Sequence, residues 1–552
     1  MAIQKLHRHL PNRVFLTAPA SLLRRSVRVI RLDTLRLLGV PYLHPLADAK
    51  ESGMSFLGID VGTTGCKAVV FSASGEPLAT AYEEYDMVRP RPGWFELDPA
   101  TVWSQVKQTI ARAVKEASKN PVTALAVSSM GESLVPVSKE RRILGASMLL
   151  IDRRGEEYLP LLSSGLSAEK LYQINGNILG IQFSLPKLMW IRDHTPEVYQ
   201  RAWKFLLWSG FVSFMLGADP VVDYSLANRT LLFDVDACRW SDQIARIASI
   251  DLEKLPDPVP AGTRIGSVTG TIANELGLAK GTAIVAGCHD QCANALGCGV
   301  TEAGAGMSGM GTYLTIVPVF TGRKPPRSMM RWGLNTEHHA VPGRFVSFIY
   351  NQGGLLLKWY RDTFARAESE AAQRMGREVY ADLIREIPPE PASVVVLPHF
   401  TVTGPPEFIS DSSGVIAGLK VETTRGEILK GILEGVIFYH KALLDSSVET
   451  GIALHELRAV GGGSKSDAWL QISADILGRP IVRTRVSEAG CLGGALIAAA
   501  GTGVFGSLEE GVRAMVSLGE RFEPDGNRQR LYNERFKKYR ALWPLMKDIL
   551  RT

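Results

Sequence analysis

Short apolar runs alternate with turn-forming residues between residues 55 and 85. In the segment SFLGIDVGTTGCKAVVFSASGEPLATAYEEY, the apolar runs are interrupted by VGTTG and by SASGEP. Glycine, serine and proline at such interruptions are typical of tight turns between strands. The pattern therefore predicts three successive strands, the first two joined by a glycine-rich turn.

The apolar spacing then changes to that of a helix. In residues 98–117 an Asp-Pro pair precedes apolar residues four positions apart, which predicts an amphipathic helix. TALAVSSM (123–130) and AIVAGCHD (283–290) have the continuous apolar character of buried strands, and the small residues of 291–299 predict a close-packed helix.

The second half of the chain repeats this plan. Residues 304–320 read as a glycine-rich turn leading into a β-run, and a strand (454–464) and two helices (467–478 and 490–503) follow. Alternating strands and helices predict an α/β fold with mixed, largely parallel sheets covered by helices. Two glycine-rich turns, one opening each half, predict two similar domains facing a central cleft.

Composition narrows the class of protein. A chain of 552 residues is too long for one compact core, and 45% hydrophobic with 21% charged residues is ordinary for a globular protein. No run of about 18 uncharged apolar residues is present, so no membrane span is expected. Six cysteines are too few for a disulfide framework, which favours the reducing cytoplasm as the compartment.

The positive net charge comes from one end of the chain. Residues 1–53 carry nine basic and three acidic residues, which account for the whole net charge of +6, whereas residues 54–552 balance 53 against 53. The main part of the chain therefore gives no electrostatic reason to expect nucleic-acid binding. The basic, leucine-rich leader allows three interpretations: a mis-assigned start before Met54 or a disordered extension, a mitochondrial targeting segment, or an appended element.

Two glycine-rich motifs are candidate ligand sites. In DVGTTG (60–65) the glycines allow a close backbone approach, Thr63, Thr64 and Lys67 suit a phosphate, and Asp60 suits Mg²⁺ held through water. VGGGSKSDAWLQISADILG (460–478) places three glycines before a helix, where a flat ring or a phosphate can lie against the backbone. A plain hairpin turn and tight strand–helix packing are the alternatives. DVGTTG has neither the G-x-x-x-x-G-K-[ST] spacing of a phosphate loop nor the G-x-G-x-x-G spacing of a dinucleotide-binding domain.

Together with further segments, these motifs resemble the FGGY carbohydrate kinases, relatives of glycerol kinase and xylulokinase in the actin-like ATPase superfamily. The resemblance runs from about residue 56 to 545 and rests on GIDVGTTGCKAVVF, PGWFELDPATVW, FSLPKLMWIRDHTPEVY, DYSLANRTLLFDV, GCHDQ, GGGSKSDAWLQISADILGRPI and EAGCLGGALIAA. It implies two actin-like (ribonuclease H-like) domains, residues 54–303 for substrate, phosphate and the catalytic aspartate, and residues 304–552 for the nucleotide. ATP and Mg²⁺ as cofactors, a small sugar or polyol as substrate, and a homodimer as one allowed assembly are also implied.

The resemblance also implies roles for individual residues. Asp290 matches the catalytic aspartate that takes the proton from the substrate hydroxyl, and Gln291 and Glu132 match polar substrate contacts. Met130 and Gln182 stand at substrate positions where this chain departs from its relatives, as does Gly131, where glycerol kinase has arginine; the substrate is therefore left open. Asp60 and Asp290 are the metal candidates. The implied nucleotide-site residues are Asp60, Gly62, Thr63, Thr64, Lys67, Gly311, Thr312, Gly462, Gly463 and Ser466.

The segment GCHDQCANALGCGV (287–300) raises a separate question, because its cysteines and histidine are ligand types for zinc. No second ligand cluster such as C-x-x-C occurs elsewhere, which favours packed, reduced cysteines over a zinc site. His289 either reaches the substrate or is a buried histidine with its own partner.

The function expected from the resemblance is transfer of the γ-phosphate of Mg-ATP to a hydroxyl of a small polyhydroxylated substrate, with Asp290 as general base. A non-catalytic nucleotide- or sugar-binding regulator on the same fold is the main alternative. A polymerising actin-like ATPase is a third, disfavoured by the segment FSLPKLMWIRD (183–193).

Overall fold

The computed structural model describes residues 14–15, 29–30, 53–409 and 411–550. The chain divides into two compact units, Met1–Ser52 and Gly53–Thr552. In the first unit, β1 (Val14–Phe15) pairs antiparallel with β2 (Val29–Ile30), and the other predictions for the leader lie outside the described residues. Among the helices of the described residues, none is long and apolar enough to cross a membrane.

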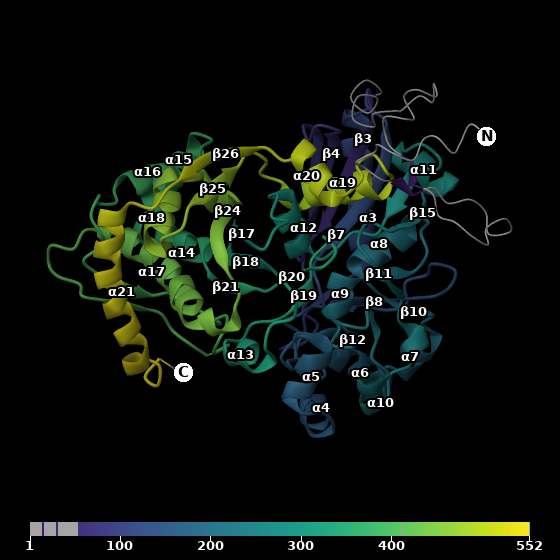
Figure 1. Cartoon of the computed structure of the whole chain (residues 1–552), viewed down its shortest axis with the longest axis horizontal. Coiled ribbons are helices and arrows are strands. Elements are labelled where there is room, and N and C mark those ends of the chain that lie inside the picture. The colour runs from purple at the N-terminus through teal and green to yellow at the C-terminus, as the bar shows by residue number, and fades with distance from the viewer. Residues whose placement is uncertain (1–13, 16–28, 31–52, 410, 551–552) are drawn as a thin grey trace. The chain divides into compact units, whose positions relative to one another are not determined.

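A six-stranded sheet forms the centre of the first half of the larger unit (Figure 1). Its strand order is β15-β16-β7-β3-β4-β5. Its strands are β3 (Ser55–Val61), β4 (Gly65–Ser72), β5 (Pro77–Glu84), β7 (Val122–Ser129), β15 (Arg264–Ser267) and β16 (Ala283–Val285). The predicted strands of residues 55–85 and the predicted buried strand at 123–130 are therefore confirmed.

An eight-stranded sheet repeats this plan in the second half, in the order β19-β20-β18-β17-β24-β25-β26, with β21 also paired to β18. Its strands are β17 (Gly304–Met310), β18 (Tyr313–Thr321), β19 (Glu337–His338), β20 (Arg344–Val346), β21 (Ile349–Gln352), β24 (Leu454–Val460), β25 (Ile481–Thr484) and β26 (Leu518–Phe522). In each sheet a hairpin (β3–β4 or β17–β18) is extended by two parallel strands and then by an antiparallel edge strand. Both sheets are mixed, as expected, but they are not largely parallel: the parallel pairs are confined to the centre and the antiparallel pairs outnumber them.

Two predicted details are wrong. The glycines of residues 304–310 lie within strand β17 rather than in a turn, and the turn is formed by Gly311 and Thr312. The strand predicted over 283–290 ends at Val285, although Ala286 still bonds to Gly262 and Thr263 and an isolated bridge joins His289 to Ser129 of β7. As a result Asp290 is the first residue of a helix and not the last residue of a strand.

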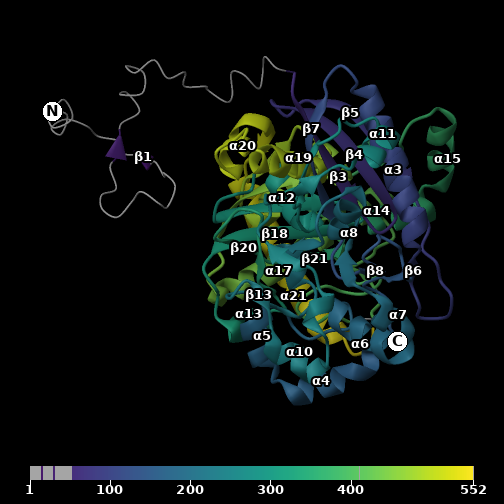
Figure 2. The same ribbon diagram turned by 90° about the vertical axis from the view of Figure 1, so that its right-hand side faces the viewer.

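Helices cover both faces of the six-stranded sheet. α3 (Pro99–Glu116) packs on β4 and β5, whereas α19 (Ala489–Gly501) packs on β3 and β7 from the other side, next to α12 (Asp290–Gly297) (Figure 2). The predicted helices at 98–117, 467–478 and 490–503 are thus confirmed as α3, α18 (Asp467–Leu477) and α19. The side chain of Asp98 accepts hydrogen bonds from the first turn of α3, as its Asp-Pro start predicts.

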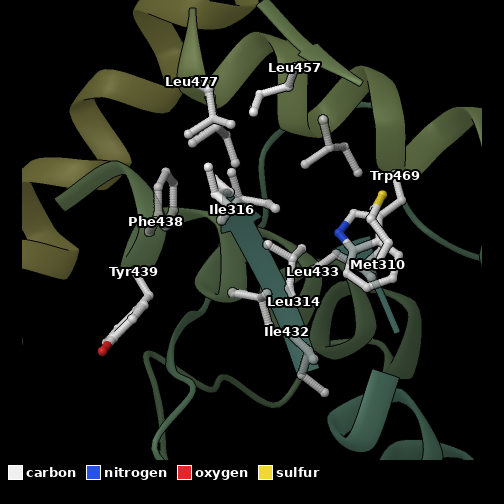
Figure 3. Packing of buried hydrophobic residues seen from close by; sticks show 14 of the residues in the cluster. Met310, Leu314, Ile316, Ile432, Leu433, Phe438, Tyr439, Leu457, Trp469 and Leu477 are labelled. Atoms are coloured by element: carbon white, nitrogen blue, oxygen red, sulfur yellow. The ribbon is translucent and has the colours of Figure 1, made fainter. Parts of the chain in front are cut away.

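The eight-stranded sheet has its own apolar core, in which strand residues such as Leu314 and Ile316 contact helix residues such as Ile432 and Leu433 (Figure 3). The helices of the second half are α13 (Pro326–Arg331), α14 (Gly354–Phe364), α15 (Arg366–Arg374), α16 (Tyr380–Arg385), α17 (Arg425–Ser446), α18, α20 (Leu508–Met515) and α21 (Gly526–Met546). Each sheet therefore has a core of its own, as a chain of this length requires.

Helix α19 joins the two halves, because it lies late in the chain but packs against the first sheet. A Cβ atom at Gly58 of β3 would lie 1.7 Å from the carbonyl oxygen of Cys491, and one at Gly493 would lie 2.1 Å from that of Ala293 on α12. These backbone contacts leave no room for a side chain at either glycine. They set the position of α19, and with it that of Glu488 at its start, beside the end of β3.

The remaining elements form insertions in both halves. The first half contains the pairs β6 (Glu96–Leu97) with β9 (Ser147–Met148), β8 (Leu134–Val137) with β10 (Lys204–Leu207), β11 (Val221–Asp223) with β14 (Asp257–Val259), and β12 (Phe233–Asp234) with β13 (Arg239–Trp240). Its other helices are α4 (Leu159–Gly165), α5 (Ala168–Asn175), α6 (Ser184–His194), α7 (Pro196–Arg201), α8 (Trp208–Leu216), α9 (Tyr224–Asn228), α10 (Asp242–Ala248) and α11 (Gly270–Leu276). The second half adds β22 (Val395–Leu397) paired with β23 (Val415–Ala417).

Candidate active site

Most of the predicted chemistry lies where the central strands of the first sheet end. Strands β3, β7 and β16 are parallel neighbours, so the residues that follow them meet at one edge of the sheet. Asp60 is the last residue but one of β3, Met130 and Glu132 follow β7, and Asp290 follows β16 after a short connection. The fold therefore brings together residues that are up to 230 positions apart in the sequence.

Asp60 is a half-buried carboxylate close to a second one. Its Oδ1 accepts a hydrogen bond of 2.7 Å from Ser128 Oγ on β7. Desolvation and the nearby Asp290 carboxylate raise the pKa of Asp60 to about 6. The negative charges of the two carboxylates repel each other. A divalent cation bound between them would remove this repulsion.

Asp290 opens helix α12 with one oxygen unsatisfied. Its side chain is 25% exposed, but Oδ1 is buried and accepts no hydrogen bond within the described part of the chain. Desolvation raises the pKa of this carboxyl, against the opposing effect of the adjacent His289. A buried acceptor without a donor is unusual in a folded protein and marks a position for a ligand group.

His289 is a buried histidine with a carboxylate partner. Its Nδ1 lies 2.8 Å from Oε1 of the fully buried Glu337, and its Nε2 lies 3.3 Å from Asp290 Oδ1. Burial alone would lower the pKa of His289, but Glu337 and Asp290 outweigh it and raise the pKa to about 9. Of the two interpretations offered by the sequence, the partnered buried histidine is confirmed, and contact with the substrate stays a prediction.

Glu132 is held in an unusual backbone conformation. Its φ of 62° lies in the left-handed region, which non-glycine residues seldom adopt, and its carbonyl accepts a hydrogen bond from Ser184 Oγ. Its Oε1 accepts from Arg229, through Nε at 2.8 Å and through Nη2. Arg229 Nη1 also lies 3.4 Å from Glu337 Oε2, so this arginine links Glu132 to the second half of the chain.

Gly131 leaves space that other side chains fill. A Cβ at this position would lie 3.0 Å from Arg229 Cγ and 3.3 Å from His289 Nε2. Met130 is buried beside it, and its sulfur accepts a long contact of 3.9 Å from Thr63 Oγ1. Gln182 is half-buried ahead of α6, and no hydrogen bond within the described residues joins it to Glu132 or Asp290. The structure thus brings Met130 into contact with the glycine-rich turn, whereas Gln182 stands next to Phe183 and Ser184, which contact Arg229 and Glu132.

The glycine-rich turn after β3 is closed by its own backbone. Gly62 N–H donates to Gly65 O at 2.9 Å, which leaves Thr63 half-buried and Thr64 exposed. Lys67 on β4, predicted to contact phosphate, forms an ion pair with Glu488 at the start of α19. The two side chains are each 30% exposed, so a ligand can still reach the ammonium group.

The other predicted nucleotide residues form a second group at the carboxyl ends of β17 and β24, which are parallel neighbours. Gly311 and Thr312 form the exposed turn after β17, and Gly462 and Gly463 follow β24. Ser466 accepts a hydrogen bond from Trp469 N and so caps helix α18. Each sheet therefore presents its own part of the predicted nucleotide site.

The cysteines near Asp290 are packed, reduced residues, as predicted. Cys288, Cys292 and Cys298 are fully buried free thiols, and burial raises the pKa of each. The ligand-type atoms of His289, Cys292 and Glu337 lie within 4.8 Å of one another, but Glu337 already accepts from both neighbours.

Sequence reasoning missed Arg229, Glu337, Ser128 and Glu488 as members of this site. Three of them stand in segments that the sequence analysis quoted: Ser128 in TALAVSSM, Arg229 as the one charge in the run SLANRTLLF, and Glu488 as the first residue of EAGCLGGALIAA. Glu337, in NTEHHAV, belongs to no recognised motif and could not have been found.

Comparison with known proteins decides the family. The model of the N-terminal domain of the FGGY family of carbohydrate kinases matches residues 55–297, and that of its C-terminal domain matches residues 316–502. The chain belongs to the FGGY family. It is therefore a carbohydrate kinase with the two-domain, actin-like fold of that family.

Individual FGGY kinases are similar over nearly their whole length. A glycerol kinase of Leptothrix cholodnii is 31% identical over 477 residues (83% of this chain, 93% of the relative), and a xylulose kinase of Bacillus subtilis is 25% identical over 496 residues (89% and 97%). The crystal structure of xylulose kinase from Rhodospirillum rubrum has a TM-score of 0.79 at 25% identity and covers 90% of this chain and 99% of its own. Relatives with two different substrates thus match at comparable levels.

Proposed function

We propose that this FGGY kinase transfers the γ-phosphate of ATP to a hydroxyl of a small polyhydroxylated substrate, either a ketose such as a pentulose or a polyol. The observation that carries the proposal is the buried Oδ1 of Asp290, which lies near His289 but accepts no hydrogen bond, among groups that bind hydroxyls. Phosphoryl transfer needs an oriented hydroxyl, neutralised charge and exclusion of water, with little covalent chemistry from the protein. The two groups of residues at the sheet edges meet these needs.

Asp290 is the proposed general base. Its Oδ1 lacks a hydrogen-bond donor, and a substrate hydroxyl is a donor that would supply one. The hydroxyl proton passes to Asp290 while the hydroxyl oxygen bonds to the γ-phosphorus of ATP, and the bond from that phosphorus to ADP breaks, so ADP leaves. Glu132, fixed by Arg229, and Gln291 on α12 are the proposed contacts for further hydroxyls of the substrate.

Asp60 and Asp290 fit a Mg²⁺ ion that accompanies ATP. Both are oxygen donors, which Mg²⁺ prefers, and burial together with the nearby Asp290 carboxylate raises the pKa of Asp60. When bound, Mg²⁺ would supply neutralisation of the phosphate charge. Met130 and Gln182 stay predicted substrate-side residues, without a contact that assigns them a hydroxyl.

The nucleotide site is proposed to use both sheet edges. The turn at Gly62, Thr63 and Thr64 would contribute hydroxyl groups that bind phosphate oxygens. Lys67 would release its ion-pair partner Glu488 and bind a phosphate instead. Gly311 and Thr312 would approach the phosphates from the second sheet. Gly462, Gly463 and Ser466 would lie by the adenine.

The proposal is tested by incubating the protein with Mg-ATP and a panel of ketoses, polyols and aldoses, and measuring both ADP release and the phosphorylated product. One strongly preferred substrate, with product formed in equal amount to ADP, is the expected result. ATP binding without turnover of any member would instead favour the non-catalytic regulator, which would bind a nucleotide or sugar on the same fold.

A further inference from the structure

The side chain of His289 lies next to the carboxylate oxygen of Asp290 that accepts no hydrogen bond. His289 Nε2 and Asp290 Oδ1 lie 3.3 Å apart, yet Oδ1 accepts no hydrogen bond, so the two atoms are close without being aligned with each other. A hydroxyl is a group that can bond to both, because its oxygen carries a proton and two lone pairs. The pair is thus suited to one hydroxyl held between the two side chains.

The orientation of His289 is fixed from the opposite side of its ring. Glu337 Oε1 lies 2.8 Å from Nδ1, and the backbone N–H of His289 donates to Ser225 Oγ at 2.9 Å. The ring also packs edge-on against Phe348, with ring centroids 5.4 Å apart. With Nδ1 occupied and the ring packed, Nε2 is the atom left for a ligand.

Residue 131 is a glycine, so no side chain from this position approaches His289 Nε2. A Cβ there would lie 3.3 Å from His289 Nε2 and 3.0 Å from Arg229 Cγ, which is tight contact with both. Without a side chain at this position, Arg229 can extend between Glu132 and Glu337, and the side chain of His289 keeps 8% of its surface exposed. Glu337, on strand β19 of the second sheet, therefore contacts both His289 and Arg229.

We infer that His289 hydrogen-bonds the acceptor hydroxyl of the sugar or polyol together with Asp290, and that Glu337 is the positioning residue that aims it. This inference rests on the proposed kinase function and adds a specificity element to it. The acceptor hydroxyl is then recognised by two side chains, and Gly131 is the position that allows this. Kinases with a larger residue at 131 would need a different arrangement around the same aspartate.

The test separates the acceptor hydroxyl from the rest of the substrate. D-xylulose, D-ribulose, D-fructose, glycerol, erythritol and xylitol are first assayed for phosphorylation by the wild-type protein. For the compound that is turned over, calorimetry without ATP compares its dissociation constant with those of two deoxy analogues, one lacking the acceptor hydroxyl and one lacking a different hydroxyl. A site that bonds a hydroxyl discriminates strongly against an analogue without it.

We expect wild-type protein to bind the substrate about tenfold or more tightly than the analogue without the acceptor hydroxyl. In Glu337→Gln and His289→Gln this ratio should fall by about fivefold or more, while the ratio for the other deoxy analogue stays the same. Gly131→Ala, which places a methyl group close to His289 Nε2, should lower the same ratio. This variant replaces Glu337→Gln or His289→Gln in the test if either of them does not fold. Glu275→Gln, at an exposed ion pair with Lys107, is the matched control and should behave as wild type.

If the wild-type protein is active and the variants keep the wild-type ratio between the dissociation constants of the analogue without the acceptor hydroxyl and of the substrate, this inference is wrong. The proposed function would then stand. Wild-type protein that neither binds nor phosphorylates any member of the panel would overturn the proposed function, and this inference with it. A parallel loss for both deoxy analogues would show general loosening of the site and would also contradict the assigned role.

Discussion

The contact between strand β3 and helix α19 allows a sharp stability prediction at Gly58. A Cβ at this position would lie 1.7 Å from the carbonyl oxygen of Cys491, half of the 3.4 Å at which ordinary contact begins. The obstacle is backbone rather than the end of a flexible side chain, so either β3 or α19 has to move. Overpacking a core costs about 1–3 kcal/mol, and a clash with backbone belongs at or above the upper end, so we expect Gly58→Ala to cost about 3 kcal/mol or more.

The assay is urea unfolding, followed by tryptophan fluorescence and far-ultraviolet circular dichroism. Gly526→Ala is the matched control, because no atom lies within 4 Å of a Cβ at the first residue of α21. That change should alter the free energy of unfolding by less than about 1 kcal/mol. Equal midpoints for Gly58→Ala and Gly526→Ala would refute the close packing of α19 on β3.

Three further predictions concern charge and domain organisation. Lys67→Met should lower the affinity for ATP, measured by calorimetry, by about tenfold. Glu488→Gln frees Lys67 from its ion pair and should leave the affinity for ATP unchanged or higher. An equal loss of affinity in both variants would mean that the ion pair is only structural. Burial lowers the pKa of His399 to about 4, below its ordinary 6.5, so its neutral form contributes fully above pH 6.5 and loses that contribution as the pH falls towards 4. The drop in urea midpoint between pH 7 and pH 5 should therefore be smaller in His399→Leu, and an equal drop would contradict this. Deleting residues 1–52 should change kcat/KM by less than about twofold, because Gly53–Thr552 is a compact unit; a larger loss in the same kinase assay would assign the leader a role.

Elements with a strong local signal were predictable from the sequence. For helix α3, Asp98 indicates where the helix begins and the regular apolar spacing indicates its length. Strands β3, β4 and β5 are separated by residues that are typical of turns. The strand predicted through Asp290 failed for a reason that no local pattern carries. Past Val285 the chain lies so close to β7 that a Cβ at Gly287 would be 1.9 Å from the carbonyl oxygen of Val127, and only an isolated bridge at His289 follows.

The site residues also fall into those that a sequence motif identifies and those that only the folded structure brings together. Asp60 and Asp290 could be identified because each belongs to a motif, and parallel strands bring such motifs to one edge. Glu337 could not, because its importance comes from its burial between His289 and Arg229, which only the folded chain brings together. The sequence shows Gly131 as a departure from its relatives, but the structure is needed to show that Arg229 occupies the space.

The most direct test of the account is the effect of Asp290→Asn on phosphoryl transfer, measured in single turnovers with the preferred substrate. Asparagine keeps the shape of the side chain but cannot accept the hydroxyl proton. We expect the rate of transfer to fall by about 10²–10⁴-fold, while the dissociation constant for Mg-ATP changes by less than about threefold. A rate close to that of the wild-type protein would contradict the assignment of Asp290 as general base, on which the proposed function depends.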